Sequence, residues 1–115
     1  MQDIRHLQLS TRVVHERDGS ARLELAGELD MNGVIQTERA VREASGLSES
    51  ALTIDLSELT FIDLFGARTL LRLADEAQAG GRKVAIANPR PHIRRLFELI
   101  TDLAPGRSLV SELVR

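Results

Sequence analysis

Cysteine, tryptophan and tyrosine are absent from this sequence, and its aromatic content is limited to three phenylalanines. Without cysteine the chain has no disulfides, no thiol nucleophile and no thiolate ligands for a metal ion. With so few aromatic residues it also lacks the stacking platforms on which proteins bind single-stranded nucleic acid. These absences exclude several common classes of enzyme and binding protein before any motif is considered.

Charge and hydrophobicity are balanced along the 115 residues. Lys and Arg number 15 against 17 Asp and Glu, with no basic cluster of the kind that binds nucleic acid. No apolar run approaches the roughly 20 residues that span a bilayer, and no segment resembles a signal peptide. We therefore expect one globular domain over residues 1–115 that is cytoplasmic, is not inserted directly in a membrane and has no nucleic-acid partner.

Two stretches near the start alternate apolar and polar residues, which is the pattern of half-buried strands. The first covers residues 7–13 and the second residues 23–27. Between them, Asp18 and Gly19 form a tight-turn signal. We expect these two strands to form an antiparallel hairpin.

A helix is predicted after the second strand. Asp30 or Asn32 can cap its first turn, because short polar side chains accept hydrogen bonds from the free amides of a helix start. The segment Ser45–Ser48, which contains a glycine, is expected to end it. Its apolar face repeats at helical spacing and consists of Val34, Thr37, Val41 and Ala44.

A strand, a loop and a helix start are predicted in the middle of the chain. Ala51–Ile54 is a short apolar run rich in β-forming residues, and Asp55–Ala67 follows it as a loop that leads into the start of a helix. The helix is expected from about Leu64 to Ala79, where a Gly-Gly pair ends it. The short apolar run Lys83–Ala87 comes next, so the β-α-β spacing predicts two neighbouring parallel strands.

Asp63 has the chemistry to cap this central helix. Its carboxylate can accept the backbone amide of Phe65 or Gly66 and also complements the positive end of the helix. Gly66 then allows another part of the backbone to approach closely. In α/β sheets the binding or active site commonly lies at such a strand-to-helix corner.

The last part of the chain contains a third helix. Pro91 suits its first turn, and a loop is expected from Thr101 to Gly106. The residues after it are consistent with a strand, a short helix or both. The whole pattern predicts an α/β domain with a mixed sheet of four or five strands and helices mainly on one face. The apolar stripe of the third helix is Ile93, Leu96, Phe97 and Ile100, and the apolar residues at the end of the chain are Leu109, Val110, Leu113 and Val114.

Three short motifs stand out when taken in register: Asp55–Ser57 with Phe61–Gly66, Gly27–Asp30 and Arg95–Leu99. They resemble motifs of STAS domains, the fold of bacterial anti-sigma-factor antagonists. Asp55–Ser57 and Phe61–Gly66 are similar to the family's Asp-Leu-Ser and its aromatic-aliphatic-Asp motif that ends in glycine. Gly27–Asp30 resembles the segment after its second strand, and Arg95–Leu99 resembles part of its third helix. The order of the predicted elements also agrees, so the resemblance covers nearly the whole chain.

The resemblance implies a regulator that works by binding another protein. Antagonists of this kind bind an anti-sigma factor that is also a serine kinase with an ATP-binding fold, and so release a sigma factor for transcription. The kinase phosphorylates a Ser or Thr directly after the motif aspartate, which ends binding, and a phosphatase resets the switch. The partner-binding residues implied for this chain are Asp30, Asp63, Leu64, Phe65, Gly66 and Arg68.

The chain departs from the family at the phosphoacceptor. Leu64 occupies that position and Phe65 follows it, so neither residue can accept a phosphate. The sequence leaves open whether these two side chains are buried in the core or exposed as anchors for a partner. Our interpretation is that docking is retained while the phosphorylation switch is lost.

Two other functions remain open. One is a STAS subunit of another assembly, such as a lipid-transport complex or a stress-sensing complex, in which no phosphoacceptor is needed. The other is a small enzyme or nucleotide-binding protein on the same fold, although no catalytic set of residues supports it. The three histidines lie in different elements without metal-ligand spacing, so no metal site and no cofactor is expected. Self-association as a homodimer also remains open.

Overall fold

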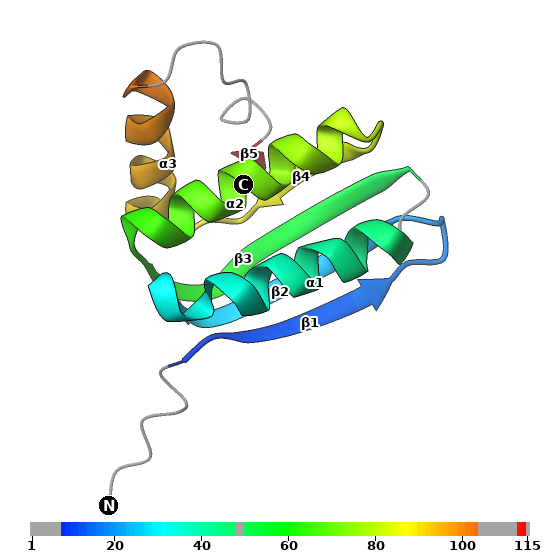
Figure 1. Ribbon diagram of the computed structural model, residues 1–115, viewed down its shortest axis with the longest axis horizontal. Helices are drawn as coiled ribbons and strands as arrows, with labels where there is room; N and C mark the ends of the chain where they lie inside the picture. Colours follow the sequence, from blue (N-terminus) through cyan, green and yellow to red (C-terminus); the bar gives the residue numbers. More distant parts are fainter. Residues whose placement is uncertain (1–7, 48–49, 104–112, 115) are drawn as a thin grey trace, which may run out of the picture.

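The computed structural model of the chain describes residues 8–47, 50–103 and 113–114. Its strands form one five-stranded sheet in the order β1-β2-β3-β4-β5, in which β1 is antiparallel to β2 and the other neighbours are parallel (Figure 1). Along the chain the elements are β1 (Ser10–His15), β2 (Ala21–Leu29), the short 3-10 helix η2 (Met31–Gly33), α1 (Val34–Leu47), β3 (Ala51–Ile62), α2 (Leu64–Ala79), β4 (Lys83–Ala87), α3 (Pro91–Leu103) and β5 (Leu113–Val114).

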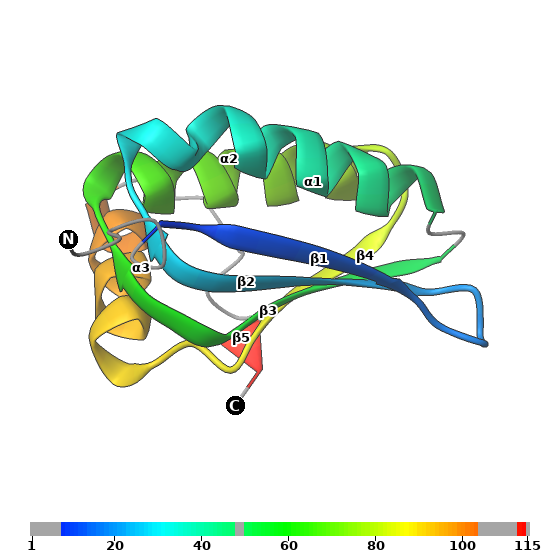
Figure 2. The ribbon, with the colours of Figure 1, turned by 90° about the horizontal axis from the view of Figure 1, so that it is seen from below.

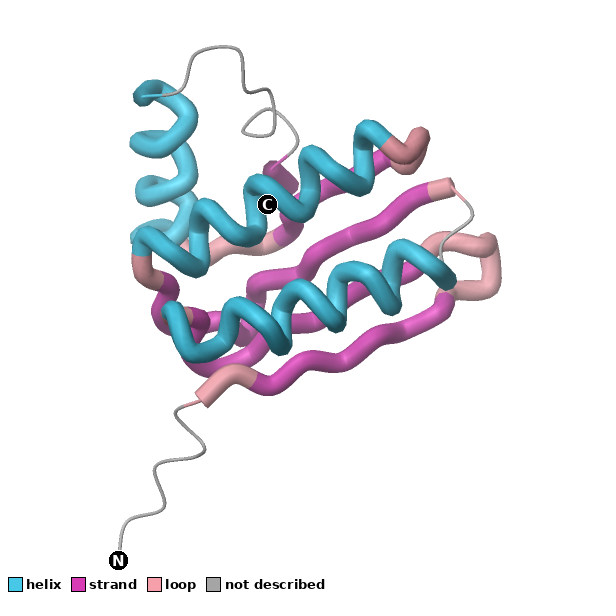
Figure 3. Tube along the Cα trace, in the orientation of Figure 1, coloured by secondary structure: helices cyan, strands magenta, loops and turns pink. Residues whose placement is uncertain are grey.

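Two helices cover one face of the sheet. α1 and α2 run side by side over it, and the two layers are clearest when the sheet is viewed close to edge-on (Figures 1 and 2). α3 stands at one end of the sheet and crosses the direction of α2 (Figure 3). The predicted α/β fold, with a mixed sheet and helices mainly on one face, is therefore confirmed.

The core lies between the sheet and these helices. Alternate residues of the central strands point into it, because successive side chains of a strand face opposite sides. The fully buried ones include Leu23, Leu25, Leu52 and Ile54. In α3, Ile93 and Phe97 are also fully buried, while Leu96 and Ile100 pack against the edge of the core, as the predicted stripe requires.

The third strand is much longer than predicted. β3 extends from Ala51 through Ile62, whereas the sequence predicted a strand that stops at Ile54 and a loop after it. It stays paired with β2 as far as Leu29 opposite Ile62, with register shifts between Glu24 and Ala26 and between Gly27 and Glu28. At both shifts β3 carries an extra residue, so the alternation of buried and exposed side chains breaks and the loop prediction was wrong.

Other boundaries also differ. The hairpin of β1 and β2 is confirmed, but β1 covers Ser10–His15, and Leu7 lies outside the described residues. α3 continues to Leu103, so the predicted loop at Thr101 was wrong; the Thr101 hydroxyl donates a hydrogen bond to the Phe97 carbonyl within the helix, at 2.9 Å. Leu113–Val114 pairs with β4 as a strand. Several predicted features lie outside the described residues: Ser48, residues 104–106 of the predicted loop, Leu109 and Val110.

Candidate functional site

The ends of β2 and β3 bring the two motif aspartates to the same edge of the sheet. Leu29 lies opposite Ile62 in the parallel ladder, and Asp30 and Asp63 are the residues that follow them. The backbone amide of Asp63 donates a hydrogen bond to the carbonyl of Leu29 at 3.1 Å, which ties the two strand ends together. Segments about thirty residues apart in the sequence therefore form one corner, from which η2 with α1 and α2 both start.

Each aspartate caps the helix that follows it. Asp63 Oδ1 accepts the amide of Gly66 at 2.8 Å, as predicted for a helix cap, and Asp30 Oδ1 accepts the amide of Asn32 at 2.9 Å. Both carboxylates also lie at positive helix ends, where a negative charge is favourable. The predicted cap at Asp63 is confirmed, and of the two candidates Asp30 and Asn32 the structure shows Asp30 as the other cap. The part of both aspartates in binding a partner stays a prediction.

Gly66 brings α2 close against β2. A Cβ atom at this position would lie 2.7 Å from both the side-chain Cγ and the backbone oxygen of Leu29, and 3.0 Å from Cγ1 of Ile62. Such distances are too short for a side chain, so only glycine fits without a shift of the backbone. Gly66 is buried, and its predicted part in binding a partner stays a prediction.

Leu64 and Phe65 are exposed. Their side chains lie in the first turn of α2, where Leu64 is 44% and Phe65 60% exposed. Of the two alternatives that the sequence left open, core or surface, the structure shows the surface. Arg68, one turn further along α2, is exposed as well.

Met31 and Ile35 are two exposed apolar residues that the sequence analysis did not single out. Met31 is 61% and Ile35 62% exposed, and they lie in η2 and the first turn of α1. Because η2 contacts α2 and both helices start from the paired ends of β2 and β3, these residues belong to the same corner as Leu64 and Phe65. The signal in the sequence was that Ile35 falls off the predicted apolar face of its helix. We call Met31, Ile35, Leu64 and Phe65 the helix-start surface.

An ion cluster joins α1 to α2 beyond this surface. The Arg72 guanidinium donates one hydrogen bond to Glu38 Oε2 at 2.6 Å and another to Glu76 Oε2 at 3.1 Å. The pKa of Arg72 is raised mainly by its hydrogen bond to Glu38, and the hydrogen bond to Glu76 raises it further. Glu38 lies one turn after Ile35, so the cluster bounds the helix-start surface on the side away from the strand ends.

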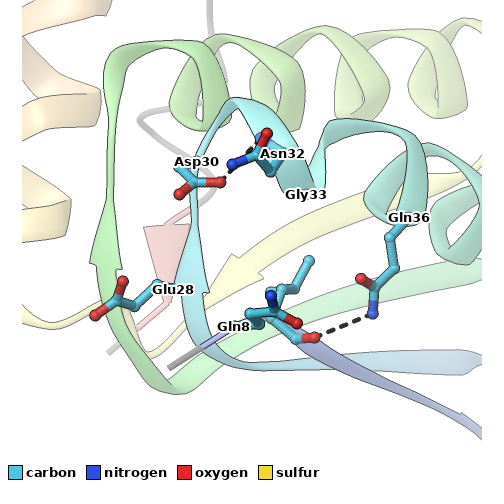
Figure 4. Close-up of a pocket in the computed structure, with 7 residues that line it drawn as sticks. Gln8, Glu28, Asp30, Asn32, Gly33 and Gln36 are labelled. Atoms are coloured by element: carbon cyan, nitrogen blue, oxygen red, sulfur yellow. Dashed lines mark hydrogen bonds between the residues drawn. The ribbon is translucent and has the colours of Figure 1, made fainter. Parts of the chain in front are cut away.

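A small polar pocket adjoins the helix-start surface on the side of β1. It has a volume of about 370 Å³, and Figure 4 shows Gln8 near Gln36, with Asp30 beside Asn32 and Glu28 on another side. Gln36 donates a hydrogen bond to the backbone oxygen of Leu9 at 3.2 Å. The lining offers carboxylates and amides without a basic residue, so it suits a hydrogen-bond donor or a cation. It is lined by Gln8, Leu9, Glu28, Asp30, Asn32, Gly33 and Gln36.

Known structures share this fold. The anti-sigma factor antagonist SpoIIAA in its unphosphorylated form is 19% identical, with a TM-score of 0.71, over 92% of this chain and 88% of SpoIIAA. An anti-sigma factor antagonist from Mycobacterium paratuberculosis is 25% identical, with a TM-score of 0.71, over 85% of this chain and 84% of that one. The murine anion transporter Slc26a9 is 16% identical, with a TM-score of 0.71, over 91% of this chain but 20% of the transporter. The fold thus occurs both as nearly a whole chain and as part of a larger one.

The family is shown by the sequence itself. No curated protein matches the chain at a significant level. Among the helices that the structure describes, none has the length and apolar character needed to cross a bilayer. A family model described as "Mlab, STAS domain", however, matches residues 13–101, which is well over half of the sequence. The chain belongs to the STAS domain family.

Proposed function

We propose that the chain is a protein-binding regulator that docks an anti-sigma factor with a serine-kinase-type ATP-binding fold and so relieves the inhibition of a sigma factor. The observation that carries this proposal is the helix-start surface, where four large apolar side chains are exposed on adjoining helix starts. The class of partner is supported by SpoIIAA and the Mycobacterium protein, which are anti-sigma factor antagonists of the same fold.

The helix-start surface has the features of a docking site. Burying a large apolar side chain contributes about 1.5–3 kcal/mol, and aromatic anchors such as Phe65 commonly dominate interface energies. Asp30 and Asp63 fix the starts of η2 and α2 through their caps. The anchors are therefore held on short, well-defined turns, which lowers the entropy cost of ordering them when a partner binds.

Docking in this protein is not switched by phosphate at the family's acceptor position. That position is Leu64, which has no hydroxyl group. In a switchable member, a dianionic phosphate would stand beside Asp63 and close to Asp30, and the like charges would repel. Here the side chain at the same place is apolar and exposed, so it adds to the docking surface.

A pair of apolar-to-charged variants tests the proposal. Phe65→Asp places a charge in the docking surface, whereas Leu47→Asp makes a similar change at an exposed leucine, 41% accessible, at the opposite end of α1. Binding to each anti-sigma factor of the source organism would be measured by isothermal titration calorimetry. We expect one of them to bind the wild-type protein, Phe65→Asp to weaken this binding about 30-fold or more, and Leu47→Asp to leave it unchanged. Equal binding by all three proteins contradicts the proposal.

A second candidate function is a STAS subunit of another assembly, such as a lipid-transport or stress-sensing complex. Leu64 at the acceptor position favours it, because such a subunit needs no phosphorylation. The same fold also forms part of the anion transporter Slc26a9. Affinity purification from the native cell with the Phe65→Asp and Leu47→Asp variants as controls separates the two functions. Phe65-dependent recovery of transporter or stress-complex subunits, without an anti-sigma factor, favours the second.

A further inference from the structure

Two arginines extend the helix-start surface along the helices. Arg39 follows Ile35 by four residues on α1, and Arg68 follows Leu64 by four residues on α2. Residues four apart on a helix are neighbours on its surface. Both arginines are exposed, and within the part of the chain that the structure describes neither makes an ion pair. One apolar residue of the surface on each helix, Ile35 on α1 and Leu64 on α2, is thus followed by an arginine without an ion pair.

Three of the acidic groups near these arginines hold partners within the chain, while Glu43, four residues after Arg39, is exposed and lies further from the apolar residues. The carboxylate of Glu38 is 2.6 Å from Arg72. Those of Asp30 and Asp63 accept backbone amides at the helix starts. The negative charge of Asp30 and Asp63 therefore stays at the strand ends, whereas the charges directly after Ile35 and Leu64 along the helices are the positive ones of Arg39 and Arg68.

We infer that the partner docks an amphipathic segment whose apolar side chains cover the helix-start surface and whose Asp or Glu residues face Arg39 and Arg68. The inference rests on the proposed function and adds the chemistry of the segment that binds. A guanidinium can hold a carboxylate through two parallel hydrogen bonds, so the arginines would fix the orientation of the segment as well as attract it. A basic segment in the same place would be repelled.

An anionic membrane surface could also bind a site in which exposed apolar side chains are flanked by arginines. The acidic groups at the strand ends argue against it. Glu28, Asp30 and Asp63 lie at the same corner as Leu64 and Phe65, and no basic residue lines the pocket that contains the first two. A flat anionic surface pressed onto the corner would meet these carboxylates, whereas a peptide segment can pass beside them. The charge pattern therefore favours a protein segment.

The test is a selection of a phage-displayed library of random linear peptides on the wild-type protein and on the double variant Arg39→Glu/Arg68→Glu. A matched double variant, Arg17→Glu/Arg95→Glu, makes the same change in net charge at two exposed arginines outside the surface. Circular dichroism and thermal unfolding check that all three proteins are folded. We expect apolar peptides enriched in Asp and Glu on the wild type and on the matched control, and peptides enriched in Lys or Arg on Arg39→Glu/Arg68→Glu. The acidic peptides should bind that variant roughly tenfold more weakly or worse.

Other outcomes overturn the inference and separate it from the proposed function. If the selected peptides lose binding on Phe65→Asp but bind Arg39→Glu/Arg68→Glu normally, the docking surface stands and its predicted charge preference is wrong. If they bind Phe65→Asp as well as wild type, the helix-start surface is not the docking site and both proposals fail. If no peptide is enriched and vesicles of phosphatidylglycerol bind in a manner that needs both arginines, a membrane surface replaces the protein segment.

Discussion

Gly66 illustrates how one residue sets the geometry of the corner. From the sequence, a glycine just after a helix cap predicts a close approach of backbone, and the structure identifies the neighbour as Leu29 on β2. That contact sets how near the start of α2 lies to the end of β2. It also determines how Leu64 and Phe65, the residues just before it, are presented to solvent.

Replacing Gly66 with alanine should therefore destabilise the protein. The added methyl group would lie 2.7 Å from two atoms of Leu29, and we expect a loss of about 1–3 kcal/mol in the free energy of unfolding. Gly46 provides the matched control, because it is exposed in α1 and its Cβ would meet nothing within 4 Å. There, alanine should raise the free energy of unfolding by about 0.5–1 kcal/mol, since it favours helix over glycine. Urea unfolding of both variants measures the difference, and a similar effect at the two positions contradicts this account.

At the scale of elements, the site depends on two helices that run side by side from one edge of the sheet. The hydrophobic period of α1 predicts most of its buried face, with Thr37, Val41 and Ala44 inside and Val34 half-buried. It says nothing about what stands next to the opposite face. Only the neighbouring α2 turns the exposed Ile35 from an isolated surface residue into part of a larger apolar surface.

The bond between Glu38 and Arg72 should contribute to this helix pairing, but only modestly. The side chains are 25% and 45% exposed, so solvent screens their attraction and we expect a coupling energy below about 1 kcal/mol. A double-mutant cycle with Glu38→Gln and Arg72→Met, followed by urea unfolding, measures it. The coupling should shrink further in 1 M salt, where the screening length falls to about 3 Å. Zero coupling at low salt would mean that the apolar core alone places α1 beside α2.

At the scale of the whole molecule, a partner kinase can be used to test how the partner approaches Leu64. If a partner kinase docks at this corner in the family's manner, Leu64→Ser should become a substrate, because the position is exposed and directly follows Asp63. Incubation with a proven partner kinase and ATP, followed by mass spectrometry, should show one added phosphate on Leu64→Ser. Wild type and Leu64→Ala should show none at this position. An unmodified Leu64→Ser protein would indicate that the kinase approaches in a different orientation.

Local chemistry made much of the fold predictable. The hairpin, the α1 and α2 helices, β4, the Asp63 cap and the start of α3 follow from alternation, helical period, turn residues and capping residues, which act over a few neighbours in the chain. For the third strand, where the prediction failed, a non-local partner was responsible. The second half of β3 looks irregular along its own length, yet β2 pairs with it through two register shifts as far as Ile62.

The sequence by itself determined the kind of domain, the Asp63 cap and the presence of a leucine directly after that aspartate, because composition, spacing and residue identity are properties of the chain alone. Only the tertiary structure decided that Leu64 and Phe65 face solvent and that Met31 and Ile35 join them. The physical reason is that exposure depends on what packs against a side chain. Here that depends on parallel pairing of β2 with β3, which brings two helix starts from distant parts of the sequence to one edge of the sheet.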